Sequence, residues 1–166
     1  CDMLPLGHIG IRAERGNDRM SGLTKDEQYT IMTLFSIFRS PLMFGGHLPD
    51  NDAFTLSLIT NKEVLYVNQH SSENRQLLNH DGKVAWMATD PKSGDKFLAL
   101  FNTADLQSGA GTSTPNWEAS EVGVELEQLG IQGKCTVTDL WSGKKLGKFK
   151  GEFAQRIRPH GAGLYR

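Results

Sequence analysis

The sequence predicts an α/β unit over residues 1–75, followed by an all-β part over residues 76–166. In the first part, an apolar helical pattern ends near Ser40, and an apolar strand follows almost at once. A polar run at residues 69–75 then separates the two parts. Beyond it, short apolar strands alternate with turn signals and no helical pattern intervenes, which is typical of an antiparallel β-sandwich.

The composition of the 166-residue chain excludes several classes of function. Its formal net charge of −1 and pI near 6.6 give no electrostatic basis for binding nucleic acid or an anionic membrane surface. No apolar run reaches the roughly 18 residues that a membrane-spanning helix needs. Cys1 and Cys135 are too few for a disulfide framework or a zinc cluster, and no cofactor motif is present, so we expect neither metal nor cofactor.

A capping box marks the start of the first helix. Glu27 follows Thr24 by three residues, so that each side chain satisfies a free amide of the first turn. Apolar residues at three- and four-residue spacing then continue to Phe38. The residues before this helix, 8–22, have neither a helical nor a strand period and predict a long loop.

Pro41 marks the end of that helix and the start of a strand. A proline ring cannot continue an α-helix, and it pushes Ser40 towards extended geometry. Residues 42–44 are apolar without alternation, which indicates a strand covered on both faces, as in a parallel sheet flanked by helices. Gly45 and Gly46 end the strand and would let the backbone approach a ligand closely, at the edge where α/β folds place their sites.

Two short helices are expected next. Residues 49–52 supply turn and capping residues for a helix over 54–59, and a capping-box pattern at 60–63 predicts a break and a further helical piece through Val67. Strand, helix, strand and helix form a βαβα unit. Because two parallel strands neither bury their faces nor close a barrel, the first part is incomplete by itself.

The second part contains five candidate strands with turn residues between them, namely residues 84–88, 97–101, 122–126, 136–141 and 152–157. Trp86 and Trp141 lie in strand patterns and are expected in the core. Trp117 lies in the loop 107–120 and is the tryptophan best suited to a carbohydrate contact. The lysines at 144, 145, 148 and 150 are expected to keep a strand edge soluble.

Three stretches of the first part resemble one known family. They are Asp2-Met3-Leu4 with Gly7, residues 40–48 (SPLMFGGHL) and residues 55–69 (TLSLITNKEVLYVNQ). Together they resemble the α-galactosidase family of retaining glycoside hydrolases, which includes the α-N-acetylgalactosaminidases. Residues 139–141 and 159–166 look like the last strands of the β-domain that follows the barrel in that family.

The resemblance implies that residues 1–75 are the last two βα units of a TIM (β/α)8 barrel and that residues 76–166 are its C-terminal antiparallel β-sandwich. It implies an α-galactoside substrate and two catalytic aspartates on earlier barrel strands, so this chain alone is expected to be inactive. Asp2, Met3 and His47 are the substrate-binding residues that it implies. The Asp2 carboxylate would hydrogen-bond sugar hydroxyls, the Met3 thioether would cover an apolar sugar face, and His47 stands where the family usually has aspartate.

Two other interpretations remain open at this point. One is a non-catalytic carbohydrate-binding β-module, and the other is a structural piece whose open edge pairs with another chain. Under each of them, exposed parallel strands and apolar surface predict self-association. His8 and His47 are loop histidines, which more often make hydrogen bonds than bind a metal. A secreted or periplasmic location is expected, without a motif that fixes it.

Overall fold

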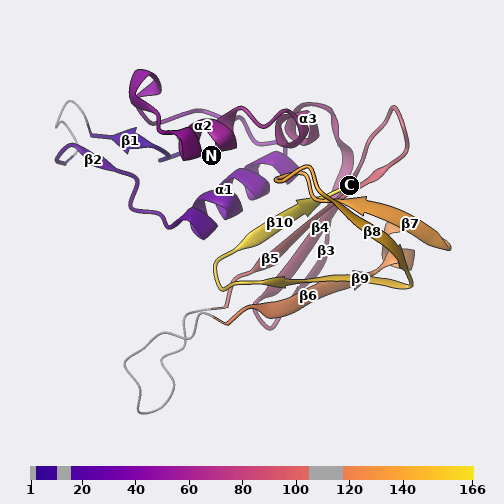
Figure 1. The fold of residues 1–166 in the computed structure, drawn as a ribbon. Helices are drawn as coiled ribbons and strands as arrows, with labels where there is room; N and C mark the ends of the chain where they lie inside the picture. The colour runs from indigo at the N-terminus through magenta and orange to yellow at the C-terminus, as the bar shows by residue number, and fades with distance from the viewer. Residues whose placement is uncertain (1–2, 11–15, 105–117) are drawn as a thin grey trace, which may run out of the picture.

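The fold is described from a computed structural model, in which residues 3–10, 16–104 and 118–166 are described. A four-stranded antiparallel sheet forms its centre, and its strand order is β10-β5-β4-β3 (Figure 1). These strands are β3 (Ser72–His80), β4 (Lys83–Thr89), β5 (Lys96–Asn102) and β10 (Ala162–Tyr165). A turn at Asp81-Gly82 joins β3 to β4, and both of its residues have the positive φ angles of a tight hairpin turn, 50° and 71°.

A second β-layer packs against one face of this sheet. It consists of two antiparallel pairs, β6 with β9 and β7 with β8. Their bounds are β6 (Ser120–Glu125), β7 (Lys134–Thr138), β8 (Lys145–Lys150) and β9 (Glu152–Ile157), and the 3-10 helix η2 (Leu126–Leu129) follows β6. Buried side chains from both layers, such as Met87, Leu100, Val122 and Phe153, meet between them. The predicted antiparallel sandwich is thereby confirmed.

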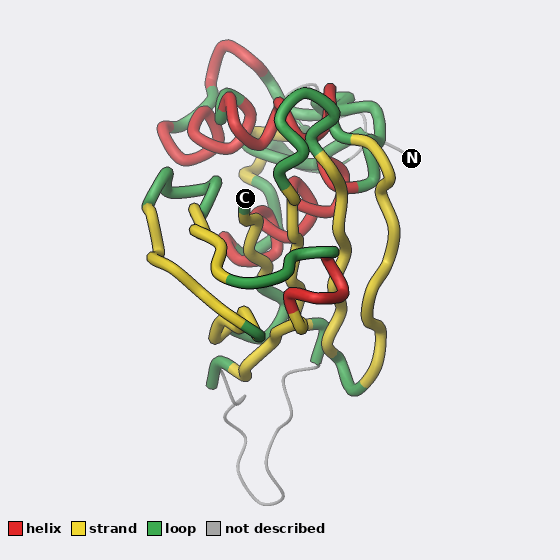
Figure 2. Tube along the Cα trace, turned by 90° about the vertical axis from the view of Figure 1, so that its right-hand side faces the viewer, coloured by secondary structure: helices red, strands yellow, loops and turns green. Residues whose placement is uncertain are grey.

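Helices cover the other face of the central sheet. They are α1 (Lys25–Ile37) and α3 (Lys62–His70), whereas α2 (Ala53–Ile59), which follows the 3-10 turn η1 (Leu48–Asp50), packs through Leu58 on the opposite side of α1. Figure 2 shows them concentrated in the upper part of the molecule, above most of the strands. Ile37 of α1 and Val64 of α3 pack on Phe97 and Phe101 of β5. Because both faces of β5 are covered, this antiparallel strand is continuously apolar from Phe97 to Phe101.

The opposite side of α1 packs on a further apolar cluster. Met32 lies there with Leu4, Leu6 and Leu58, and Phe44 borders the group. Helix α1 is therefore buried from two directions, which explains why its apolar stripe is too wide for an ordinary surface helix. Its capping box is formed as predicted, since the Thr24 side chain accepts from the Glu27 amide and the Glu27 carboxylate accepts from the Thr24 amide.

The structure corrects three expectations for the first part. The predicted strand at 42–44 is reduced to a single bridge, although Phe44 pairs with Leu4 in the expected parallel direction. It is not covered on both faces, because Met43 is 55% exposed. Residues 8–22 are not a plain loop, since β1 (His8–Ile9) and β2 (Arg19–Met20) pair within them.

Two details of the helices and strands also differ from expectation. The cap of α3 is the Asn61 side chain, which accepts from the amides of Glu63 and Val64, whereas Thr60 ends α2. Strand β3 was not predicted, and it runs through residue 75, where the boundary between the two parts was expected; that boundary stays a prediction. Among the described residues, no helix is long and apolar enough to cross a lipid bilayer.

Candidate functional site

The candidate site lies where the two parallel segments of the first part come together. The Leu4 amide donates to the Met43 carbonyl at 2.7 Å, and the Gly45 amide donates to the Leu4 carbonyl at 2.9 Å. Side chains alternate across this bridge. Leu4 and Phe44 point into the cluster under α1, whereas Met3 and Met43 are 56% and 55% exposed. The two methionines thus mark one uncovered apolar face.

Gly45 and Gly46 allow the two segments to approach this closely. A Cβ at Gly45 would lie 3.0 Å from the Leu4 carbonyl oxygen, and a Cβ at Gly46 would overlap the Leu6 carbonyl oxygen. Neither glycine has a positive φ, so glycine is not needed here for an unusual backbone conformation. It is needed because there is no room for a Cβ atom. The close approach is to the neighbouring segment, which differs from the sequence-based expectation of an approach to a ligand.

A chain of histidines and carboxylates borders the same edge. His47 Nδ1 lies 2.7 Å from an Asp50 carboxylate oxygen, and His8 Nδ1 lies 3.7 Å from the same oxygen. On its other side His8 Nε2 contacts Asp18. The His47 amide also donates to the His8 carbonyl at 2.7 Å. Both histidines therefore have hydrogen-bonding partners, as predicted, and both are tied to carboxylates.

These contacts decide where the predicted site residues lie. Met3 lies at the edge, because a Cβ placed on Gly45 would be 3.1 Å from the Met3 Cβ. His47 follows Gly45 by two residues. Asp2 lies outside the described residues, as does Trp117. Their roles at a sugar, and those of Met3 and His47, stay predictions.

Sequence reasoning missed Asp18 and Asp50 as members of this edge. Asp50 was interpreted as a turn residue, although its spacing of three residues from His47 within the 3-10 turn is a signal for a side-chain pair. Nothing local indicates Asp18, because its contact with His8 depends on the pairing of β1 with β2. Within the described residues, no group of three or more His, Cys, Asp or Glu side chains is arranged to hold a metal ion.

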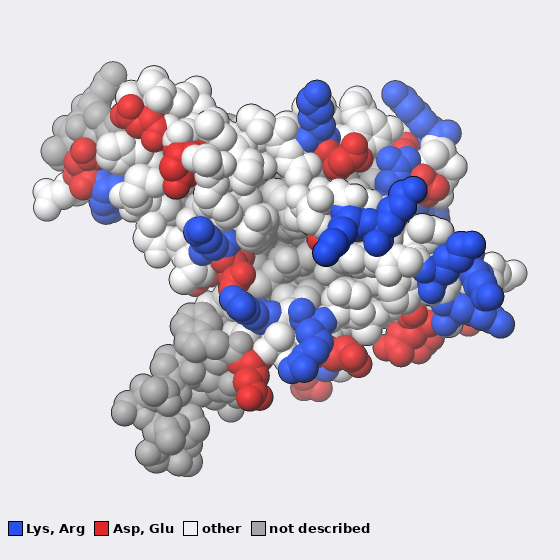
Figure 3. All heavy atoms as spheres, in the orientation of Figure 1, with Lys and Arg blue, Asp and Glu red and all other residues white. Residues whose placement is uncertain are grey.

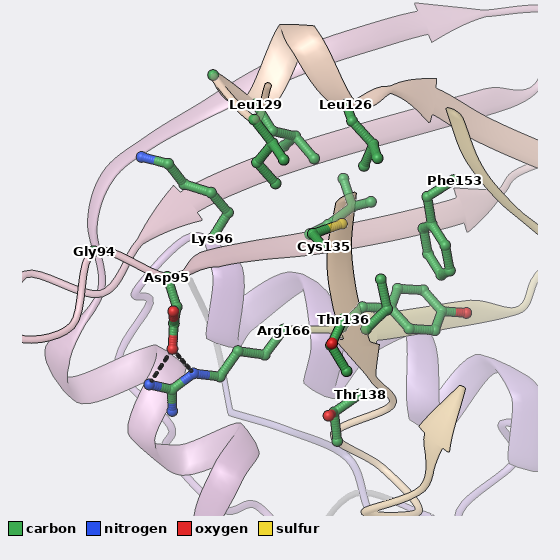
Figure 4. Close-up of a pocket in the computed structure, with 15 residues that line it drawn as sticks. Gly94, Asp95, Lys96, Leu126, Leu129, Cys135, Thr136, Thr138, Phe153 and Arg166 are labelled. Carbon is green, nitrogen blue, oxygen red and sulfur yellow. Dashed lines mark hydrogen bonds and ion pairs between the residues drawn. The ribbon is translucent and has the colours of Figure 1, made fainter. Parts of the chain in front are cut away.

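A cavity lies in the sandwich, and neither Met3 nor Met43 lines it (Figure 4). It is a cavity of about 560 Å³ between η2, β7 and the ends of β5 and β10. Leu126, Leu129 and Phe153 form apolar walls, and Arg166 is paired with Asp95 at 2.9 Å at one side. Burial raises the pKa of the Tyr165 phenol far above its usual range, with the Asp139 carboxylate adding to the effect, so the group stays neutral.

The two tryptophans expected in the core are both partly buried. Trp86 packs edge-on against Phe38 with ring centroids 4.2 Å apart, and Trp141 donates from Nε1 to the Thr33 hydroxyl at 2.9 Å. Trp141 also borders the cluster around Met32. Their contacts are with the protein itself, which agrees with the structural role predicted for them.

Known proteins resemble this chain in sequence. Residues 81–166 match the family described as the α-galactosidase C-terminal β-sandwich domain. α-Galactosidase D of Emericella nidulans is 26% identical over 169 residues, which cover 98% of this chain and 22% of the relative. α-Galactosidase 3 of Arabidopsis thaliana is 25% identical over 171 residues, which cover 99% of this chain and 34% of the relative. The chain thus spans between about a fifth and a third of the curated relatives that it matches.

A solved structure resembles the chain in fold as well. It is the GH27 β-L-arabinopyranosidase of Geobacillus stearothermophilus, which is 45% identical with a TM-score of 0.87. The match covers 99% of this chain and 35% of that chain, so it includes the segments around Met3 and His47 as well as the sandwich. A second structure of that enzyme is in complex with arabinose.

Proposed function

The chain belongs to the α-galactosidase C-terminal β-sandwich family, and from this premise we propose that it is the carboxyl-terminal part of a retaining glycoside hydrolase acting on terminal α-linked galactose. In this proposal residues 1–75 are the last two βα units of a (β/α)8 barrel, and residues 76–166 are the sandwich that follows. This chain covers only part of each relative, and we propose that the remaining barrel strands correspond to the part that it does not cover.

One observation carries the proposal. Leu4 and Phe44 form a parallel bridge, whereas every strand pair of the described sandwich is antiparallel. Parallel strands need neighbours on both sides and cover on both faces. Met3 and Met43 instead expose apolar surface on the side opposite α1, which is the side that a barrel interior would occupy.

The same geometry supports catalytic residues outside this chain. A retaining glycosidase uses two carboxyl groups about 5–5.5 Å apart, one as nucleophile and one as acid and base. The carboxylates of Asp18 and Asp50 at this edge are both paired with histidines. Met3 and His47, together with Asp2, are proposed to contact the sugar, and the chain by itself is proposed to be inactive.

The similarity to the Geobacillus enzyme favours a second substrate, a β-L-arabinopyranoside. This sugar has the ring configuration of α-D-galactose and lacks only the hydroxymethyl group attached to C5. An exposed thioether such as that of Met3 would pack on the same ring face of either sugar. A pocket distinguishes the two sugars by whether it leaves space for the hydroxymethyl group. Both sugars are therefore tested as substrates.

The test is a graft of this chain onto the barrel that it is proposed to complete. The 166 residues replace the matching third of the Geobacillus enzyme, and hydrolysis of nitrophenyl α-galactoside and β-L-arabinopyranoside is measured. We expect turnover by the graft and none by the chain alone. Met3→Ala in the graft should raise KM by about tenfold, since one apolar contact with a substrate is worth that much, and Leu56→Ala on the exposed side of α2 should leave KM unchanged.

Two outcomes would contradict the proposal. Turnover by the isolated chain at a rate typical of enzymes, on the order of 10 per second, would show that it carries its own catalytic carboxylates. A folded graft that binds the sugar without turnover, while the isolated chain binds it equally well, would favour the non-catalytic carbohydrate-binding module.

A further inference from the structure

Positive charge is concentrated in one hairpin of the sandwich. Residues 134–150 contain five lysines and one aspartate, a net charge of +4, whereas the whole chain has −1. The rest of the chain therefore carries −5. Figure 3 shows Lys and Arg side chains gathered on the side of the molecule where β7 and β8 lie. This separation of charge is not explained by the sandwich core or by the site around Met3.

The register of the hairpin brings the lysines onto one face. Across the two strands, Lys134 pairs with Lys150, Thr136 with Lys148 and Thr138 with Lys145. The alternating positions, which include Cys135, Val137 and Phe149, face the core. Four lysines thus form the outward face of the hairpin, which we name the lysine face. Its lysines are all exposed. Thr136 and Thr138 lie beside them and also line the cavity of the sandwich.

The lysine face is electrostatically unfavourable in the absence of a partner. Like charges directly opposite each other, such as Lys134 and Lys150, lie about 5 Å apart at Cβ and destabilise a strand pair. Among the described residues, the ion pairs with carboxylates are made by arginines and histidines and involve none of these lysines. Asp139, the one acidic residue in the segment, accepts instead from Ser142 and the Trp141 amide. Solubility of the strand edge accounts for the presence of lysines, but it does not account for two of them lying directly opposite each other.

We propose that the lysine face binds an acidic polysaccharide, with lysine ammonium groups on successive uronic acid carboxylates and threonine hydroxyls on sugar hydroxyls. Lysines two residues apart on β8 repeat at about 6.7 Å along the strand, and a uronic acid polymer likewise carries its charges at regular intervals. The remaining net charge of −5 opposes an extended anionic surface, such as a membrane or a DNA duplex, which would also meet acidic side chains. A single flexible polysaccharide strand contacts the hairpin alone.

The choice of a polysaccharide over another polyanion rests on the proposed function. A hydrolase of terminal α-linked sugars meets many of its substrates as side groups on polymers. A second contact on the same polymer raises the effective concentration of those side groups at the barrel. The lysine face lies on the sandwich, so it would hold the backbone of such a polymer while the edge around Met3 takes a terminal sugar.

The experiment uses the 166-residue chain and polygalacturonate as the probe. Binding is measured by affinity electrophoresis and by titration with a galacturonate oligomer at low salt. The test variant is Lys134→Gln, Lys148→Gln and Lys150→Gln combined, and the matched control is Lys62→Gln, Lys83→Gln and Lys92→Gln, which removes the same charge elsewhere. We expect the Kd to rise by about tenfold or more in the test variant and by less than about twofold in the control, since the test variant loses three positive charges from the proposed binding surface and the control loses them elsewhere. Thermal melting checks that both variants fold.

Three results would overturn this inference. The first is no binding of polygalacturonate by the unaltered chain, and the second is an equal loss in the test and control variants. The third is equal or tighter binding of duplex DNA or of phosphatidylserine vesicles, which would make the lysine face a general polyanion surface. Galactomannan serves as the neutral polymer and should not bind there. None of these results bears on turnover by the graft, so the two proposals fail separately.

Discussion

Gly46 is the residue at which the two parallel segments come closest. An added Cβ would overlap the Leu6 carbonyl oxygen and lie 2.7 Å from the Phe44 ring, so the segments would have to separate. We expect Gly46→Ala to lower the free energy of unfolding by about 1–3 kcal/mol, the usual cost of overpacking. Gly22→Ala is the control, because nothing lies within 4 Å of its Cβ position. Urea unfolding measures both, and equal midpoints would argue against the close approach.

Asp90 is a buried carboxylate, 1% exposed, that holds the end of the chain. Arg166 Nη2 lies 2.9 Å from one carboxylate oxygen, and the Tyr66 hydroxyl donates to the other. The Lys92 backbone amide, followed by the Ser93 and Tyr66 hydroxyls and Arg166, holds the pKa of Asp90 below its usual value. These contacts favour the charged form over the neutral form.

The pH dependence of stability follows from this lowered pKa. The stabilisation is complete above the pKa of an unfolded aspartate, about 3.9, and is lost as the pH falls towards the lower pKa of folded Asp90. Asp90→Asn should therefore lower the urea midpoint at pH 7 and flatten its decline below about pH 4. Asp81→Asn, at an exposed turn, should leave both unchanged. A wild-type decline that persists in Asp90→Asn would assign it to other carboxylates.

At the scale of elements, α1 connects the two parts through its first turns. Its capping box joins Thr24 to Glu27, and Glu27 also lies 3.1 Å from His160 Nδ1 in the turn before β10. The Thr30 hydroxyl donates to the His160 carbonyl at 2.6 Å. The Thr24 amide, followed by the hydroxyl and His160, keeps the pKa of Glu27 below its usual value. One end of the helix is thus tied to the sandwich.

Removal of the cap tests this connection. Thr24→Ala should cost about 1 kcal/mol of unfolding free energy, because an amide of the first turn loses its acceptor, and Thr24→Ser should restore most of it. Chemical denaturation of the three proteins provides the measurement. Equal stability of the alanine and threonine forms would mean that packing alone fixes the start of α1.

Elements were predictable where a local chemical signal decides them. The starts of α1 and α2 were predictable from the caps at Thr24 and Asp52, because capping depends on residues three positions apart. Pro41 indicated that α1 ends before it. Strand β3 gave no such signal. Its sequence SENRQLLNH lacks apolar alternation, it has two register shifts, and it is held chiefly by pairing with β4. Pairing between distant segments is a tertiary property, so a short sequence window does not contain it.

The candidate site was predictable to a similar extent. Met3 and His47 were assigned because the resemblance covers the segments that carry them. The structure brings both to one edge, and their roles at a sugar stay predictions. Asp18 was not, since its contact with His8 exists only once β1 and β2 have paired. Three members of the lysine face, at 145, 148 and 150, belong to the cluster seen in sequence, whereas Lys134 joins them only through the register of β7 and β8.

For the whole molecule, the uncovered face predicts association of the isolated chain. Met3, Met43 and Leu48 are all exposed near the parallel bridge, and apolar surface of this kind seeks a partner. Sedimentation velocity should show dimers or larger species that increase with concentration. Met43→Gln should reduce them, whereas Leu56→Gln on α2 should not. A monomer at every concentration tested would contradict this expectation.

The burial of β5 on both faces determines where such a protein can be truncated without exposing its core. Phe97 and Phe101 contact α1 and α3, while Leu98 and Leu100 contact the second β-layer. A truncation that begins at residue 81, where the family match starts, would remove both helices and leave those phenylalanines in water. Exchange of this sandwich between hydrolases should therefore succeed only when α1 and α3 are transplanted with it.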